Sequence, residues 1–141
     1  MNRKRGVSIL VATSVLLAIG SSCGDSGGGT TPTGTPGVAT VSLVTPNADD
    51  GAVIVTVKGE GLGAVTAASG SLLVFPRQVS ATEVRVIVVG NLAAAPLFNI
   101  AVGAVNRLSS YSGDVNEVAS RDNLVRASTA GYSLRLTNAA P

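Results

Sequence analysis

The sequence contains no histidine and no tryptophan, and it has one cysteine among its 141 residues. Without histidine, the chain lacks the commonest general base and cannot form a Ser-His-Asp or Cys-His catalytic group by itself. Zinc sites built from cysteine and histidine are excluded as well, and a single cysteine cannot form a disulfide within the chain. We therefore expect a protein that is not an enzyme, holds no cofactor or metal, and owes its stability to a hydrophobic core.

The only cysteine, Cys23, follows a leader with three distinct parts. Residues 3–5 are basic, residues 7–19 are apolar and uncharged, and residues 20–22 are small. This order resembles the signal peptide and lipobox of bacterial lipoproteins, although Gly20 stands where a leucine is usual. The resemblance implies that Cys23 is lipidated, carries palmitate or a similar acyl chain, and anchors the mature protein in the cell envelope. Signal cleavage without lipid and an uncleaved membrane anchor are the alternatives.

The residue after Cys23 bears on which membrane holds the protein. Gly24 stands there, and the first acidic residue, Asp25, comes one place later. In Gram-negative lipoproteins an acidic residue directly after the cysteine marks retention in the inner membrane, so the resemblance implies the outer membrane, on its periplasmic or surface side.

Composition divides the chain into three parts: a signal peptide over 1–22, a lipidated cysteine and tether over 23–37, and one domain over 38–141. Residues 24–37 contain no large apolar side chain, so they are predicted to form a flexible tether. Three of the ten Lys+Arg residues lie in the leader, whereas all eight Asp+Glu residues lie beyond it, which leaves the mature chain a net charge of −1. Its arginines are scattered rather than clustered, so nucleic acid is not an expected partner.

The pattern from residue 38 onward predicts an all-β, antiparallel β-sandwich of about seven or eight short strands. Apolar, valine-rich runs recur at intervals near ten residues and are separated by turn residues. The strands are expected at 40–45, 52–58, 71–75, 84–89, 97–105, 114–118 and 132–137, with a possible short one at 124–126. Residues 106–111 fit a loop, a helical turn or an edge strand.

Side-chain alternation predicts which residues form the core. In the last strand Tyr132, Leu134 and Leu136 alternate with polar residues, so they are expected to face inward. The runs at 52–57 and 86–89 are apolar at nearly every position, which indicates strands buried on both sides or a face covered by a partner. Phe75 and Phe98 are predicted to be core aromatics.

The order of these elements resembles cohesin-like β-sandwich domains. The resemblance is carried by the valine-rich strand at 51–57, the GEGLG turn at 59–63, and the segments at 89–92 and 97–102. It implies two antiparallel sheets and either binding of a protein in the cell envelope or a structural role as an extracellular module. No single motif is diagnostic, and fold alone does not carry function.

Two motifs match binding sites in part. The GEGLGA segment at 59–64 fits a relaxed dinucleotide fingerprint, but too few residues follow it for the helix that would hold a pyrophosphate. The segment from Asp114 to Glu117, with Asp122, begins like a calcium loop and then departs from the required spacing. Asp49 and Asp50 stand before a glycine and are typical of a turn.

Two further residues keep alternative functions open. Tyr111 lies among serines and is the aromatic ring best placed for exposure, so a glycan or small-ligand site around it is the alternative binding hypothesis. Lys58, the only lysine beyond the leader, leaves a Ser-Lys hydrolase as a remote alternative. The leading hypothesis is a lipid-anchored structural or protein-interaction module without catalytic activity.

Overall fold

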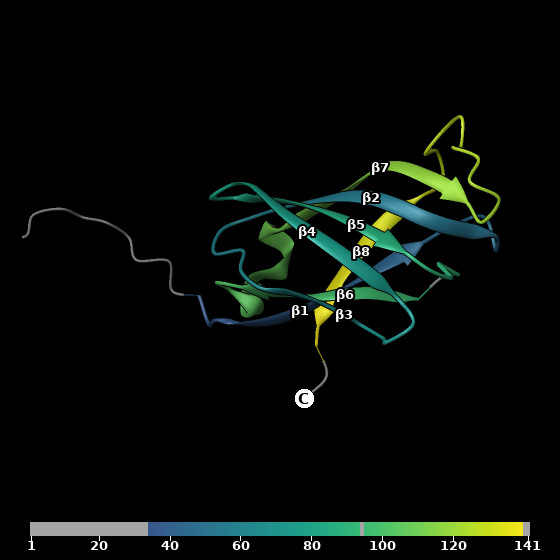
Figure 1. Ribbon diagram of the computed structural model, residues 1–141. Helices are drawn as coiled ribbons and strands as arrows, with labels where there is room; N and C mark the ends of the chain where they lie inside the picture. The colour runs from purple at the N-terminus through teal and green to yellow at the C-terminus, as the bar shows by residue number, and fades with distance from the viewer. Residues whose placement is uncertain (1–33, 94, 140–141) are drawn as a thin grey trace, which may run out of the picture.

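A computed structural model of the chain describes residues 34–93 and 95–139, and Figure 1 shows two sheets of four antiparallel strands packed face to face. The first sheet has the order β3-β6-β1-β8 and the second the order β4-β5-β2-β7. The strands are β1 (Gly37–Val44), β2 (Asp50–Lys58), β3 (Val65–Ala67), β4 (Leu73–Ser80), β5 (Glu83–Val89), β6 (Pro96–Val102), β7 (Ser112–Ser120) and β8 (Ser133–Asn138). The predicted all-β sandwich is confirmed.

Several strand bounds differ from those predicted, most of all in β4, which runs to Ser80 where the sequence predicted an end at Phe75. Three other differences concern whether a strand is present or where it gives way to another structure. The three-residue β3 was not predicted, because residues 65–70 were expected to form only a connection. Residues 105–110 form the short 3-10 helix η1 (Val105–Ser110), so β6 ends at Val102. The possible strand at 124–126 is reduced to one isolated bridge between Ala119 and Val125.

The core lies between the two sheets and follows the period-two alternation of the strands. On β5 the buried residues are Val84, Val86 and Val88, while the residues between them face outward. Phe98 on β6 is fully buried, as predicted. Leu134 and Leu136 pack against this core from β8, and Tyr132 packs against it from the position just before β8. All three remain only half-buried, and β8 is an edge strand.

Phe75 was predicted to be a core aromatic, and this prediction is wrong. Its side chain is 55% exposed, because β4 is an edge strand of the second sheet and Phe75 lies opposite the outward-facing Ile87. Period-two alternation shows which residues share a face, but it does not show which face meets the other sheet.

Both ends of the described chain lie at one end of the sandwich. The amide of Thr35 donates to Asn106 Oδ1 at 3.0 Å, and its carbonyl accepts from the amide of Val105 at 2.8 Å, so ordered contacts begin before Val38. Asn138 near the C-terminus pairs with Ala39. The segment between β7 and β8 lies at the opposite end (Figure 1). Cys23 and the signal peptide fall outside the described residues, and no helix within them is long and apolar enough to cross a membrane.

Candidate binding surface

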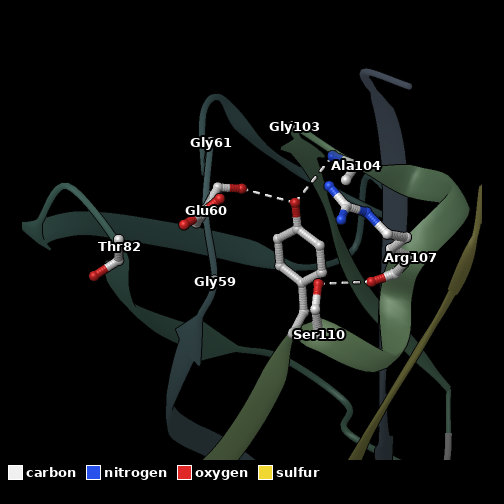
Figure 2. A pocket seen from close by; sticks show the side chains of 9 residues that line it. Gly59, Glu60, Gly61, Thr82, Gly103, Ala104, Arg107 and Ser110 are labelled. Atoms are coloured by element: carbon white, nitrogen blue, oxygen red, sulfur yellow. Dashed lines mark hydrogen bonds between the residues drawn. The ribbon is translucent and has the colours of Figure 1, made fainter. Parts of the chain in front are cut away.

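A hollow of about 430 Å³ opens at the end of the sandwich where the described chain begins. Its walls are the turn at 59–61, the turn between β4 and β5, and the 3-10 helix. Glu60, Arg107 and Ser110 surround it in Figure 2. The side chain of Ser110 donates to the backbone carbonyl of Arg107 at 2.8 Å, so this hydroxyl supports the 3-10 helix.

Tyr111 lines this hollow, but it is buried, and the prediction that its ring is exposed is wrong. Its hydroxyl donates to the backbone carbonyl of Glu60 at 2.7 Å and accepts from the backbone amide of Ala104 at 3.0 Å. A buried tyrosine whose hydroxyl bonds to two backbone groups joins distant segments of a fold. Tyr111 therefore ties the 59–61 turn to the end of β6 and offers no open ring face for a sugar.

The glycine-rich turn serves this packing. A Cβ atom on Gly59, whose φ is +154°, would lie 2.1 Å from Tyr111 Cδ1, so no larger residue fits there. Gly61 has a φ of +68° and lies against the backbone of Gly103. The residues that follow form β3 rather than a helix, so the segment lacks the helix N-terminus that a dinucleotide site requires.

The acidic residues of β7 do not come together as a calcium loop would require. Asp114 Oδ2 lies 3.6 Å from Lys58 Nζ, across the strand pair β2 and β7. Asn116 Oδ1 accepts a hydrogen bond of 2.7 Å from the hydroxyl of Thr56. Within residues 34–93 and 95–139, no three acidic side chains gather in a group that could hold a metal ion.

We call the end of the sandwich that holds the segment between β7 and β8 the distal end. It contains a polar network that the sequence did not predict. Asp50 is fully buried, and its Oδ1 accepts from Arg126 Nε at 3.1 Å and from the Tyr132 hydroxyl at 3.1 Å. Its Oδ2 accepts from the Thr45 hydroxyl at 2.6 Å. Asn47 Nδ2 in turn donates to the Tyr132 hydroxyl. The carboxylate thus joins the start of β2 to the loop before it and to the segment between β7 and β8.

Both carboxylate oxygens of the buried Asp50 accept hydrogen bonds, which indicates a structural role. The hydrogen bond to Asp50 raises the pKa of Arg126 above its ordinary value, and Asp49 adds to the effect, so the guanidinium stays charged. No buried side-chain nitrogen or oxygen among the described residues lacks a hydrogen-bond partner. The sequence Asp49-Asp50-Gly51 predicted a turn. The hydrogen bond from Arg126 to Asp50 could not be predicted from local spacing, because the two residues are 76 positions apart.

The outer face of the second sheet is apolar and uncovered. Ile87 lies opposite Ile54 on β2 and Phe75 on β4, and Val89 lies opposite Ala52 and Leu73. Leu73, Phe75, Ile87 and Val89 are 60%, 55%, 41% and 37% exposed, whereas Ile54 and Ala52 are half-buried. We call these six residues the outer apolar face: Ala52, Ile54, Leu73, Phe75, Ile87 and Val89.

Two arginines lie next to this face. Arg77 and Arg85 are directly opposite each other on β4 and β5, one row of side chains away from Phe75 and Ile87. Both are exposed, and neither forms an ion pair with a carboxylate of the described part of the chain. Aromatic, aliphatic and arginine side chains together are typical of the residues that protein interfaces bury.

Comparisons with protein-family models, with curated proteins and with solved structures found no match. The resemblances to bacterial lipoproteins and to cohesin-like domains therefore remain predictions. The functional assignment accordingly depends on the surfaces described above.

Proposed function

We propose that the protein is a lipid-anchored, non-catalytic interaction module of the cell envelope, and that it binds a protein partner through the outer apolar face. The observation that carries this proposal is the exposure of that face on β2, β4 and β5, whose opposite side already packs against the core. An exposed, contiguous group of large apolar side chains is a common mark of a binding surface on a soluble domain.

The apolar runs in β2 and β5 had two explanations, namely burial on both sides or a face covered by a partner. Ile87 and Val89 remain exposed, so no part of chain 34–93 or 95–139 covers them. The sequence of residues 24–33 contains no large apolar side chain. This exposure favours the second explanation, in which a partner molecule covers the face.

The anchor in this proposal is lipid on Cys23, in the outer membrane. It is supported by the order of basic, apolar and small residues before the only cysteine. Acyl labelling and the intact mass of the mature protein test it. We expect acylation in the parent protein and none in Cys23→Ser, whose described domain should keep its thermal unfolding midpoint. A mature parent chain that begins elsewhere and carries no lipid would remove the anchor from the proposal.

A second candidate function is binding of a small ligand or glycan in the hollow beside Tyr111. The hollow, about 430 Å³, falls in the size range of small-molecule sites, and it presents the side chains of Glu60 and Arg107. It ranks second because the Tyr111 ring is buried and its hydroxyl is already bonded twice. A hydrolase remains the remote alternative, and reproducible turnover abolished by one polar substitution would establish it against our proposal.

Photo-crosslinking in cells tests the interaction role directly. A photoreactive phenylalanine analogue at position 75 should form one dominant crosslink to a protein, and the same analogue at Val44 should not. Val44 is the matched control, because it is 42% exposed but lies on the first sheet. The crosslinked protein, once purified, should bind the parent chain and lose affinity for Phe75→Ser. Equal crosslinking at both positions would argue against a specific surface.

A further inference from the structure

The pairing of Arg77 with Arg85 is unfavourable in the isolated domain. Residues directly opposite on neighbouring antiparallel strands have Cβ atoms about 5 Å apart, and like charges at such positions repel. Glu83, two residues before Arg85 on the same face, lies opposite Ser80 and Lys58 and forms no ion pair with either arginine. The described part of the chain therefore gives neither of these adjacent guanidinium groups an ion-pair partner.

We propose that the partner places a carboxylate between Arg77 and Arg85 while its apolar side chains cover Phe75 and Ile87. This inference rests on the proposed function and adds the chemistry of the partner: a protein segment in which an aspartate or glutamate stands near large apolar residues. The guanidinium group suits this task because its planar donors bind a carboxylate at two points, and because it tolerates partial burial better than an ammonium group.

The geometry of β4 favours contact across the face rather than addition of a strand at the edge. β4 is an edge strand, but Pro76 in its middle has no N–H to donate. The register of β4 also shifts between Gln78 and Ser80, which interrupts the regular ladder that an added strand would continue. The partner therefore lies over the side chains of β4, β5 and β2.

A second copy of this chain fits the same face less well. Its own outer apolar face would bring another arginine pair to the interface. The carboxylates near that face are Glu117, opposite Ile54 at the β7 side, and Glu83, beside the arginine pair itself. An anionic lipid surface would also satisfy apolar and basic groups, and it is the other occupant to be tested. The peptide selection that follows distinguishes a second copy and a lipid surface from an acidic protein segment.

Selection of peptides from a displayed random library on the purified full-length chain tests the proposal. Enriched peptides should combine aromatic or aliphatic residues with an aspartate or glutamate. Their affinity should fall about ten-fold or more in Arg85→Glu, since a charge-assisted pair is lost and a repulsion replaces it. Replacing the peptide's acidic residue with lysine should restore binding to Arg85→Glu. Arg135→Glu on the first sheet is the matched control and should leave the affinity unchanged.

Other outcomes overturn the inference in separable ways. If binding depends on Phe75 but not on Arg85, the acidic partner is wrong and the interaction surface stands. If binding is indifferent to both Phe75→Ser and Arg85→Glu, the proposed function fails as well. Binding to phosphatidylglycerol vesicles that depends on both residues, without peptide enrichment, would assign the face to a lipid surface. Dimerisation abolished by Arg85→Glu would assign it to a second copy. Arg85→Gln, with its thermal unfolding measured first, replaces Arg85→Glu if the latter does not fold.

Discussion

The two sheets of the sandwich differ on their outer faces although both bury the same kind of inner face. On the first sheet the outward residues in the middle of the paired strands are polar: Thr40 lies between Asn99 and Thr137, and Ser42 lies opposite Arg135. The exposed Val38 and Val44 lie near the two ends of β1. Thr40 also donates its hydroxyl to Asn99 Oδ1 at 2.8 Å. On the second sheet the corresponding central rows hold isoleucine, phenylalanine, leucine and valine.

This difference separates what folding needs from what the surface does. Folding needs one apolar side per sheet, and the first sheet shows that hydrogen-bonded polar residues are sufficient on the other side. The apolar outer residues of the second sheet are not required for the core, because Val84, Val86 and Val88 supply β5's share of it. Their presence is therefore better explained by binding than by stability.

The sharpest test of this difference compares neighbours on β5. Val86→Asp should prevent folding, at a cost of about 4 kcal/mol or more, because it places an unpaired charge in the fully buried core. Ile87→Asp, one residue along, should cost less than about 1 kcal/mol, because its side chain faces solvent. Chemical denaturation of both variants measures the difference. Similar losses would mean that the outer apolar face stabilises the fold.

The network around Asp50 links three segments at the distal end of the second sheet. Asp50→Ala should lower the free energy of unfolding by about 2–3 kcal/mol, because it leaves the Thr45 hydroxyl, the Tyr132 hydroxyl and the Arg126 guanidinium without their shared acceptor. Asp49→Ala is the control and should have a much smaller effect, since the Asp49 side chain is largely exposed. Equal destabilisation by the two substitutions would show that burial of Asp50 is not what matters.

The sequence was sufficient to predict most of the strands, but it was not sufficient to predict which side chains distant segments bury. Valine-rich runs with turn residues between them predicted seven of the eight strands, because alternation is a local property of the chain. Phe75 was misplaced because exposure depends on which strand lies at the edge, and that is set by pairing between distant segments. Tyr111 was misplaced for a similar reason: its burial comes from the glycine turn at 59–61, which lies far away in the sequence.

The same limit applies to the candidate surface. The apolar run at 86–89 indicated a covered face but left open whether the cover was the protein itself. Only the tertiary structure shows that Arg77 and Arg85 lie side by side, since they belong to different strands joined by a turn. The Asp50 network could not be predicted either, because its members come from three separate segments.

The substitution with the smallest expected effect on stability compares the outer faces of the two sheets most directly. Phe75→Ser should change the free energy of unfolding by no more than about 0.5 kcal/mol, because the ring is largely exposed at an edge strand. It should nevertheless reduce the binding of a hydrophobic fluorescent dye to the folded domain, since it removes the largest side chain of the outer apolar face. Val44→Ser on the first sheet should leave dye binding nearly unchanged, because Val44 is similarly exposed but has the polar Ser133 opposite it. Equal loss of dye binding in the two variants would mean that the faces do not differ in the way their residues indicate.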